Sequence, residues 1–155
     1  MLEIGEKAPE FTLQDQDEQN RSLAEFKGKW VVLYFYPKDD TPGCTKEACT
    51  IAEIYNDFAV LGTVVLGVSA DSPESHRKFR EKYNLPFTLL SDPGTKMMQS
   101  YKAWKPKSMF GRKFLGIQRM TYIINPEGVI VKVYPKADPA NHALELLKDL
   151  KTLVN

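Results

Sequence analysis

The two cysteines of the chain, Cys44 and Cys49, lie within the segment PKDDTPGCTKEAC, residues 37–49. An apolar run, 30–36, precedes this segment, and its proline, aspartate and glycine residues predict a turn that leads into a helix near Cys44. Free N–H groups and aligned peptide dipoles place about half a positive charge at a helix N-terminus, which favours an ionised sulfur. Because the thiolate is the reactive form of cysteine, Cys44 is a candidate nucleophile.

The helix expected after the turn places the two sulfurs on different faces. An apolar stripe continues on the side of Cys44, and Cys49 is rotated away from it; the stripe consists of Ala48, Ile51, Tyr55 and Phe58. On an intact helix, Cα atoms five residues apart are separated by ~8.7 Å, from a rise of ~1.5 Å per residue and a radius of ~2.3 Å. A disulfide requires less than roughly 7 Å. The two cysteines can therefore bond only if the helix unwinds locally.

The spacing of the two cysteines argues against three common roles: a structural disulfide, a CxxC disulfide carrier and a zinc site. A structural disulfide would break the helix that carries the apolar stripe, and a disulfide carrier with a CxxC motif would space its cysteines more closely. The two cysteines with His76 and His142 give no zinc-ligand spacing, so no metal is expected. Three alternatives stay open. The chain could be a general thiol-disulfide oxidoreductase, it could be a non-enzymatic redox sensor or binding module, or Cys49 could be a surface thiol and Cys44 a small residue at a helix start.

Composition limits the remaining classes. With 155 residues, 43% hydrophobic and 26% charged, the chain is expected to form one globular domain, 1–155, with a sizeable core. The 21 basic and 20 acidic side chains nearly cancel, so no nucleic acid and no anionic membrane is expected as a partner. No signal peptide and no apolar run of about 18 residues is visible, which predicts a cytoplasmic protein with no membrane span.

The elements that must position the cysteines alternate between strand and helix over the first two thirds of the chain. We expect strands at 11–13, 30–36, 63–70 and 87–90, and helices from Cys44, from Pro73 to Tyr83, and through Met97 to Tyr101. The last third predicts a hairpin of strands 120–124 and 129–134, and then a helix opened by Asp138 and Pro139. The order predicts an α/β protein of thioredoxin-like fold, a central mixed β-sheet flanked by helices.

The residues around Cys44 also carry a family resemblance. Thr41-Pro42-Gly43-Cys44-Thr45, with Glu47, Cys49, the upstream Pro37 and the later segment GRKFLGIQRMTYIINPEG, resembles the peroxiredoxins of the bacterioferritin comigratory protein (BCP) or PrxQ subfamily. The similarity covers essentially the whole chain. It implies the peroxiredoxin variant of the thioredoxin-like fold, with an N-terminal extension, and an atypical two-cysteine thiol peroxidase that needs no cofactor.

The resemblance assigns roles to five positions. It makes Cys44 the peroxidatic cysteine and Cys49 the resolving cysteine, and it matches Pro37, Thr41 and Arg119 to positions that complete a peroxide pocket. Cys44 would become a sulfenic acid, condense with Cys49 to an intramolecular disulfide, and be regenerated by thioredoxin or a similar dithiol donor. Hydrogen peroxide and organic hydroperoxides are the implied substrates. An intramolecular resolving cysteine also predicts a monomer.

Each assigned pocket residue has a chemical reason and a simpler alternative. Arg119 can favour the thiolate and polarise the peroxide, or it can be a surface partner of a carboxylate. The Thr41 hydroxyl can bond the peroxide or only a turn. Pro37 lacks an N–H and would shield the thiolate, or it merely ends a strand. Glu47 could orient an arginine or complement the helix dipole, and we leave it outside the predicted site.

A basic and aromatic segment, Trp104 to Gly116, remains after these assignments. We predict that it is a loop that borders the pocket and is apolar enough to admit organic hydroperoxides. The alternative is a solvated loop with tucked aromatic side chains. Its basic side chains are Lys105, Lys107, Arg112 and Lys113.

Overall fold

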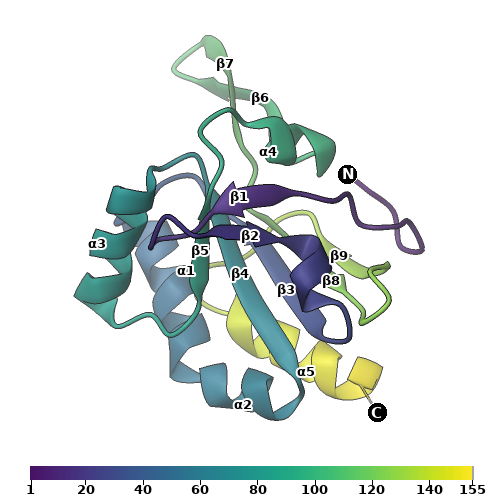
Figure 1. Ribbon diagram of the computed structural model, residues 1–155. Coiled ribbons are helices and arrows are strands. Elements are labelled where there is room, and N and C mark those ends of the chain that lie inside the picture. The colour runs from purple at the N-terminus through teal and green to yellow at the C-terminus, as the bar shows by residue number, and fades with distance from the viewer. Residues whose placement is uncertain (155) are drawn as a thin grey trace.

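A computed structural model describes residues 1–154 of the chain. A seven-stranded mixed sheet in the order β2-β1-β5-β4-β3-β8-β9 forms its centre, and a separate two-stranded sheet, β6-β7, projects from the body (Figure 1). The strands are β1 (Thr12–Gln14), β2 (Asn20–Ser22), β3 (Trp30–Phe35), β4 (Thr63–Ser69), β5 (Thr88–Ser91), β6 (Trp104–Met109), β7 (Arg112–Ile117), β8 (Met120–Ile124) and β9 (Ile130–Tyr134). The helices are η1 (Leu23–Phe26), α1 (Pro42–Glu53), α2 (Tyr55–Val60), α3 (Pro73–Tyr83), α4 (Lys96–Ser100) and α5 (His142–Val154).

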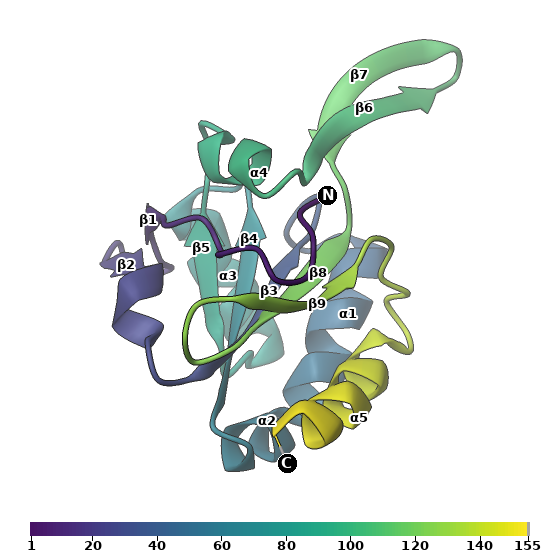
Figure 2. The same cartoon turned by 90° about the vertical axis from the view of Figure 1, so that its right-hand side faces the viewer.

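The central strand β3 is buried on both faces, as its unbroken apolar sequence predicts. Val31, Leu33 and Phe35 pack into a core shared with η1 and α4. The alternate residues Val32 and Tyr34, with Tyr36 after the strand, pack into a second core shared with α1, α2, α3 and α5. Helices on one face and the N-terminal segment with α4 on the other cover the sheet (Figure 2).

The pairing of β3 determines where the cysteine turn lies. This strand runs parallel to β4 and antiparallel to β8, so Phe35 at its end is opposite both Val68 and Met120. The turn from β3 to α1 therefore meets the residues that precede β8. Arg119, 75 positions after Cys44 in the chain, comes beside it for this reason.

The thioredoxin-like α/β fold is confirmed, with four local differences from the sequence prediction. The helix at Cys44 starts earlier, at Pro42, and stops at Glu53; the stripe continues in α2 after a break at Ile54, whose φ and ψ are −114° and 19°. Strand β2 was not predicted. The last helix begins at His142, after a turn in which the Asn141 N–H donates to the Asp138 carbonyl.

The largest difference concerns residues 104–116, for which the prediction of a loop was wrong. The segment forms an antiparallel hairpin in which Met109 is opposite Arg112. Its two connecting residues both have positive φ, 53° at Phe110 and 76° at Gly111, as a tight type I′ connection requires. Phe-Gly is a weaker signal for this turn than Asn-Gly, and Pro106 within the run argues against a strand.

Candidate active site

Cys44 lies in the first turn of α1 with its side chain turned into the core. The residue is 2% exposed and packs with Ala48 and Ile51. Cys44 therefore lies on the buried face of the helix, as the sequence predicts. Thr41 is the extended residue before the helix, with φ −104° and ψ 156°, and Pro42 takes the first helical position. The Thr41 hydroxyl donates to the Lys38 carbonyl at 2.8 Å and makes no bond to the N–H groups of the helix. The Thr41 side chain therefore leaves the first N–H groups of α1 uncapped.

Arg119 binds the sulfur of Cys44 directly. Its Nη2 donates to Cys44 Sγ at 3.1 Å, and its Nη1 donates to Glu47 Oε1 at 2.7 Å. The guanidinium passes so close over Gly43 that a Cβ there would lie 3.2 Å from Nη2. One planar cation thus joins the nucleophile, a carboxylate and the turn backbone.

Glu47 belongs to this site although the sequence prediction set it aside. Its side chain is fully buried, and Oε2 has no hydrogen-bond partner among residues 1–154. Burial raises the pKa of Glu47 to about 7, against the opposing effect of Arg119. Burial lowers the pKa of Arg119, but the negative neighbours Glu47 and Cys44 outweigh it and raise that pKa. The signal in the sequence was the i, i+3 spacing from Cys44, which places both residues on one helix face.

A buried tyrosine lies under the same group of residues. The Tyr34 hydroxyl has no hydrogen-bond partner in the described part of the chain, and burial followed by the charges of Glu47 and Cys44 raises its pKa well above the usual value. The ring has room because residue 67 is glycine, where a Cβ would lie 2.9 Å from the Tyr34 hydroxyl. The side chain beneath the site is therefore aromatic and uncharged.

Cys49 is half-buried on the same helix, and both cysteines are free thiols. Burial raises the pKa of Cys49, Glu53 raises it further, and Lys46 opposes them. Cys49 is thus held as a thiol while α1 is intact. Since α1 runs without interruption from Pro42 to Glu53, the two cysteines cannot form a disulfide in this conformation.

The other two predicted pocket residues lie in the turn between β3 and α1. Thr41 is half-buried at the start of α1, and Pro37 is exposed just beyond β3. Their roles toward a peroxide stay predictions.

The β6-β7 hairpin contributes Lys107. Burial and the charge of Arg119 lower the pKa of Lys107, and the negative charge of Cys44 opposes them. Lys107 is thus electrostatically coupled to the site, whereas Phe110 at the tip is 98% exposed.

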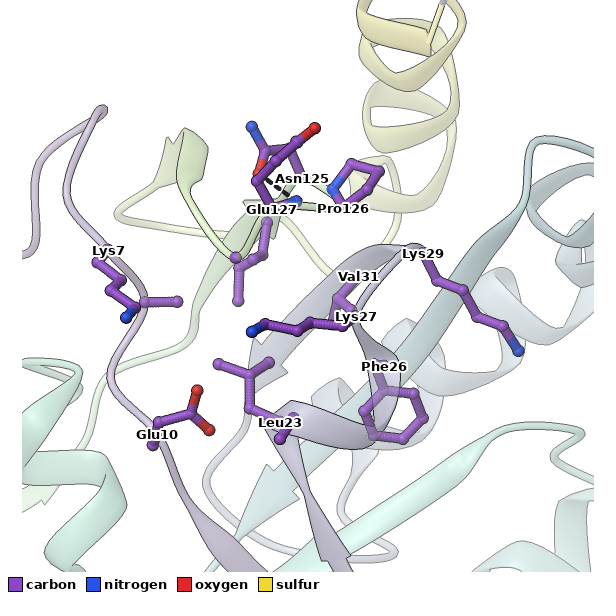
Figure 3. A pocket seen from close by; sticks show the side chains of 14 residues that line it. Lys7, Glu10, Leu23, Phe26, Lys27, Lys29, Val31, Asn125, Pro126 and Glu127 are labelled. Carbon is purple, nitrogen blue, oxygen red and sulfur yellow. Dashed lines mark hydrogen bonds between the residues drawn. The ribbon is translucent and has the colours of Figure 1, made fainter.

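A hollow separate from the residues around Cys44 lies near the start of β3, at the end of the strand away from the cysteine turn. Leu23, Phe26 and Val31 contribute apolar side chains to its lining, and Lys27 and Glu127 contribute charged ones (Figure 3). Its lining contains neither cysteine, and it offers no thiol chemistry.

The fold and the site together define a class of protein. A thioredoxin-like sheet that presents a buried cysteine at a helix N-terminus, with an arginine on its sulfur, is the architecture of a thiol-based redox enzyme. The chain belongs to the AhpC/TSA family, whose profile matches residues 4–133.

Named relatives narrow the class. The chain is 49% identical over 146 residues to a protein of Coxiella burnetii described as putative peroxiredoxin bcp, covering 94% of this chain and 97% of that one. It is 45% identical over 152 residues to peroxiredoxin Bcp of Bacillus subtilis, covering 98% and 97%. These relatives identify a thiol peroxidase and confirm the resemblance to the BCP and PrxQ proteins.

Solved structures agree with this assignment. A PrxQ cysteine-to-serine variant from Xylella fastidiosa matches with a TM-score of 0.94 and 31% identity over 100% of this chain and 99% of that one. The bacterioferritin comigratory protein of Xanthomonas campestris, studied for alkyl peroxide reduction, matches with a TM-score of 0.90 and 36% identity over 94% and 92%. Among residues 1–154, no helix is long and apolar enough to cross a membrane.

Proposed function

We propose that the chain reduces hydrogen peroxide and organic hydroperoxides through Cys44, with Cys49 as the resolving thiol and thioredoxin or a similar dithiol protein as the reductant. The observation that carries the proposal is the 3.1 Å contact between Arg119 Nη2 and Cys44 Sγ. A guanidinium at this position stabilises the thiolate, and it also lies where the charge of a breaking O–O bond develops.

The chemistry proceeds in three balanced steps. The Cys44 thiolate attacks one peroxide oxygen, the O–O bond breaks, and the departing alkoxide or hydroxide takes a proton to leave as alcohol or water. The sulfenic acid on Cys44 then condenses with the Cys49 thiol, which forms a disulfide and releases water. A dithiol donor reduces the disulfide by exchange and is itself oxidised.

The helix gives the second step its structural requirement. Cys44 and Cys49 belong to one intact helix, and Cys49 is held as a thiol there. We infer that the sulfenic acid forms while α1 is folded and that the first turns unwind before the disulfide closes. A disulfide within one chain also supports a monomer as the working unit. Two cysteines that are free thiols in the resting protein are typical of a reducing compartment such as the cytoplasm.

The substrate range rests on the surroundings of the site. The β6-β7 hairpin adds Lys107, which is electrostatically coupled to Cys44, and exposes Phe114 and Leu115 farther along. The Xanthomonas relative, studied for alkyl peroxide reduction, supports organic hydroperoxides as substrates. Pro37 and Thr41 are proposed to complete the pocket, the first as a shield without an N–H and the second as a hydroxyl partner of the peroxide.

A coupled assay tests the proposal. Peroxide consumption is followed through NADPH oxidation with thioredoxin and thioredoxin reductase, for the wild type, Cys44→Ser and Cys49→Ser. We expect Cys44→Ser to be inactive and Cys49→Ser to react once without turnover. Unimpaired turnover by Cys44→Ser would rule out the proposed mechanism. Reduction of insulin disulfides without any need for peroxide would favour a general thiol-disulfide oxidoreductase.

A further inference from the structure

A second group of buried polar side chains lies behind the turn that carries the cysteine. Asp39, in the turn between β3 and α1, is 7% exposed, and His76 of α3 is fully buried. Asp39 Oδ2 lies 2.7 Å from His76 Nδ1, and the other ring nitrogen, Nε2, lies 2.9 Å from the Leu90 carbonyl of β5. None of these residues has a part in the peroxidase chemistry described above.

The hydrogen-bond partners determine how many protons the ring carries. A carbonyl oxygen only accepts, so Nε2 must hold a proton to donate to Leu90. Nδ1 faces a carboxyl group at hydrogen-bond distance, so one further proton lies between His76 and Asp39.

The other partners of Asp39 place that proton on the ring. The carboxylate accepts from the Tyr36 hydroxyl at 2.5 Å through Oδ1 and from the Ser75 hydroxyl at 2.8 Å through Oδ2. Burial, followed by the charge of Asp39, raises the pKa of Tyr36, so this hydroxyl remains a donor. These two hydroxyl donors favour the ionised form of the carboxylate, which leaves the shared proton on His76.

One more acidic group approaches the pair, and it too has partners. Asp71, after β4, accepts from the Asp39 backbone N–H at 2.8 Å and from the Ser69 hydroxyl at 2.7 Å through Oδ2. Ligand atoms of Asp39, Asp71 and His76 lie within 4.8 Å of one another, and hydrogen bonds inside the protein account for them. The turn is thus bonded to β4, α3 and β5 through a single aspartate.

We propose that Asp39 and an imidazolium form of His76 make a buried ion pair that anchors the turn before α1 and holds the first turn of that helix folded. The role of the pair in the reaction rests on the proposed function, because it concerns the segment between Cys44 and Cys49 that must unwind. The anchor lies two residues before Thr41, so it fixes the N-terminal boundary of the unwinding segment. Asp39 and His76 are positioning residues, and they touch no reacting atom.

The neighbouring Asp40 provides a matched control. It lies in the same turn and also bonds α3, accepting from Lys82 Nζ at 2.8 Å and from the Tyr83 hydroxyl at 2.7 Å. Asp40 is exposed, however, and exposed ion pairs contribute little to folded structure. Asp40 has a φ of 54°, a left-handed conformation that asparagine tolerates better than alanine. Asp39→Ala and Asp40→Asn therefore each remove one negative charge from the same turn, the first charge buried and the second exposed.

Two measurements on the reduced protein test the anchor without any peroxide. In ¹⁵N NMR spectra at neutral pH, we expect both ring nitrogens of His76 to carry protons in the wild type. In Asp39→Asn, whose amide can donate to Nδ1, we expect Nδ1 to be unprotonated. A wild-type His76 with one bare ring nitrogen would overturn the ion pair. Hydrogen exchange of amides 45–49, the first of which donates to the Thr41 carbonyl, should be roughly tenfold faster in Asp39→Ala and unchanged in Asp40→Asn; equal exchange in the two variants would overturn the anchor.

A kinetic measurement separates positioning from a general loss of stability. In Asp39→Ala, we expect oxidation of Cys44 by peroxide to slow roughly tenfold and closure of the disulfide to become faster, because the folded first turn is needed only for the first step. General damage would not accelerate the second step, so slowing of both steps would contradict the positioning role. Failure of the wild type to consume peroxide would refute the proposed function and leave the NMR and exchange results to decide on the anchor.

Discussion

Replacement of Arg119 probes the chemistry of the site most sharply. Its guanidinium makes two charged hydrogen bonds, 3.1 Å to Cys44 Sγ and 2.7 Å to Glu47 Oε1. Arg119→Lys keeps the charge but has a single ammonium group that cannot reproduce both directions of the planar fork. Arg119→Met keeps much of the length and removes both bonds.

The expected losses follow from the energy of such bonds. A hydrogen bond with a charged partner contributes about 1.5 to 3 kcal/mol, and about 1.4 kcal/mol changes a rate tenfold. Arg119→Lys, which loses one bond, should lower the second-order rate constant for Cys44 oxidation about 10- to 150-fold. Arg119→Met should lower it at least 100-fold, as does the loss of a donor that stabilises developing charge.

The same replacement has a separate effect on stability. Without Arg119, Glu47 has no cation beside it in a fully buried position, so its pKa rises further and it takes up a proton. The unfolded chain releases that proton, so the free energy of unfolding of Arg119→Met should continue to fall with rising pH beyond the range in which that of the wild type levels off. Glu47→Gln in the Arg119→Met background should restore stability and leave the rate low.

Two measurements separate these effects. Rapid mixing of reduced protein with peroxide, followed by alkylation of the remaining thiol, gives the rate of Cys44 oxidation, and urea unfolding gives the stability. An Arg119→Met rate within about threefold of the wild type would refute the role assigned to the guanidinium. If Glu47→Gln in the Arg119→Met background restored both the oxidation rate and the stability, the slow oxidation of Arg119→Met would be due to its lower stability.

Three further predictions concern the same helix. Because burial raises the pKa of Glu47 from 4.5 to about 7, the folded chain retains a proton that the unfolded chain releases in this range, and unfolding free energy should fall by up to roughly 3 kcal/mol as pH rises through it. Glu47→Gln should remove this slope in urea titrations, and a slope that persists unchanged would contradict it. Gly43→Ala places a methyl group 3.2 Å from Arg119 Nη2, so the oxidation rate should fall several-fold without loss of helix stability, whereas Gly94→Ala, where nothing lies within 4 Å of the added carbon, should leave the rate unchanged. Oxidation to the disulfide should increase hydrogen exchange of amides 45–49 but not of those in α3, and equal protection in both redox states would count against unwinding.

The sequence predicts the elements that carry strong local signals. Strands β3 and β4 are continuous apolar runs, and α3 follows Ser72 and Pro73, where the Ser72 side chain accepts from the Ser75 N–H at 3.1 Å as a helix cap should. The hairpin at 104–117 was missed because its turn, Phe110-Gly111, relies on positive φ at a phenylalanine.

The site was predictable to the extent that it depends on one segment. The TPGCT motif and the helix pattern identified Cys44 and its buried face, and the family resemblance supplied Arg119. The partnership of Glu47 with Arg119 and that of Asp39 with His76 join residues 72 and 37 positions apart. Such pairs are set by sheet register and helix packing, which no local pattern encodes.

The central claim is that peroxide oxidises Cys44 and that Cys49 resolves the product. Intact-protein and peptide mass spectrometry after one equivalent of peroxide tests it most directly. We predict that the wild type loses two hydrogen atoms as Cys44 and Cys49 join, and that Cys49→Ser gains one oxygen atom located on Cys44. Oxygen on Cys49 of the Cys44→Ser variant at the wild-type rate, or an unmodified Cys44 in Cys49→Ser, would contradict the account.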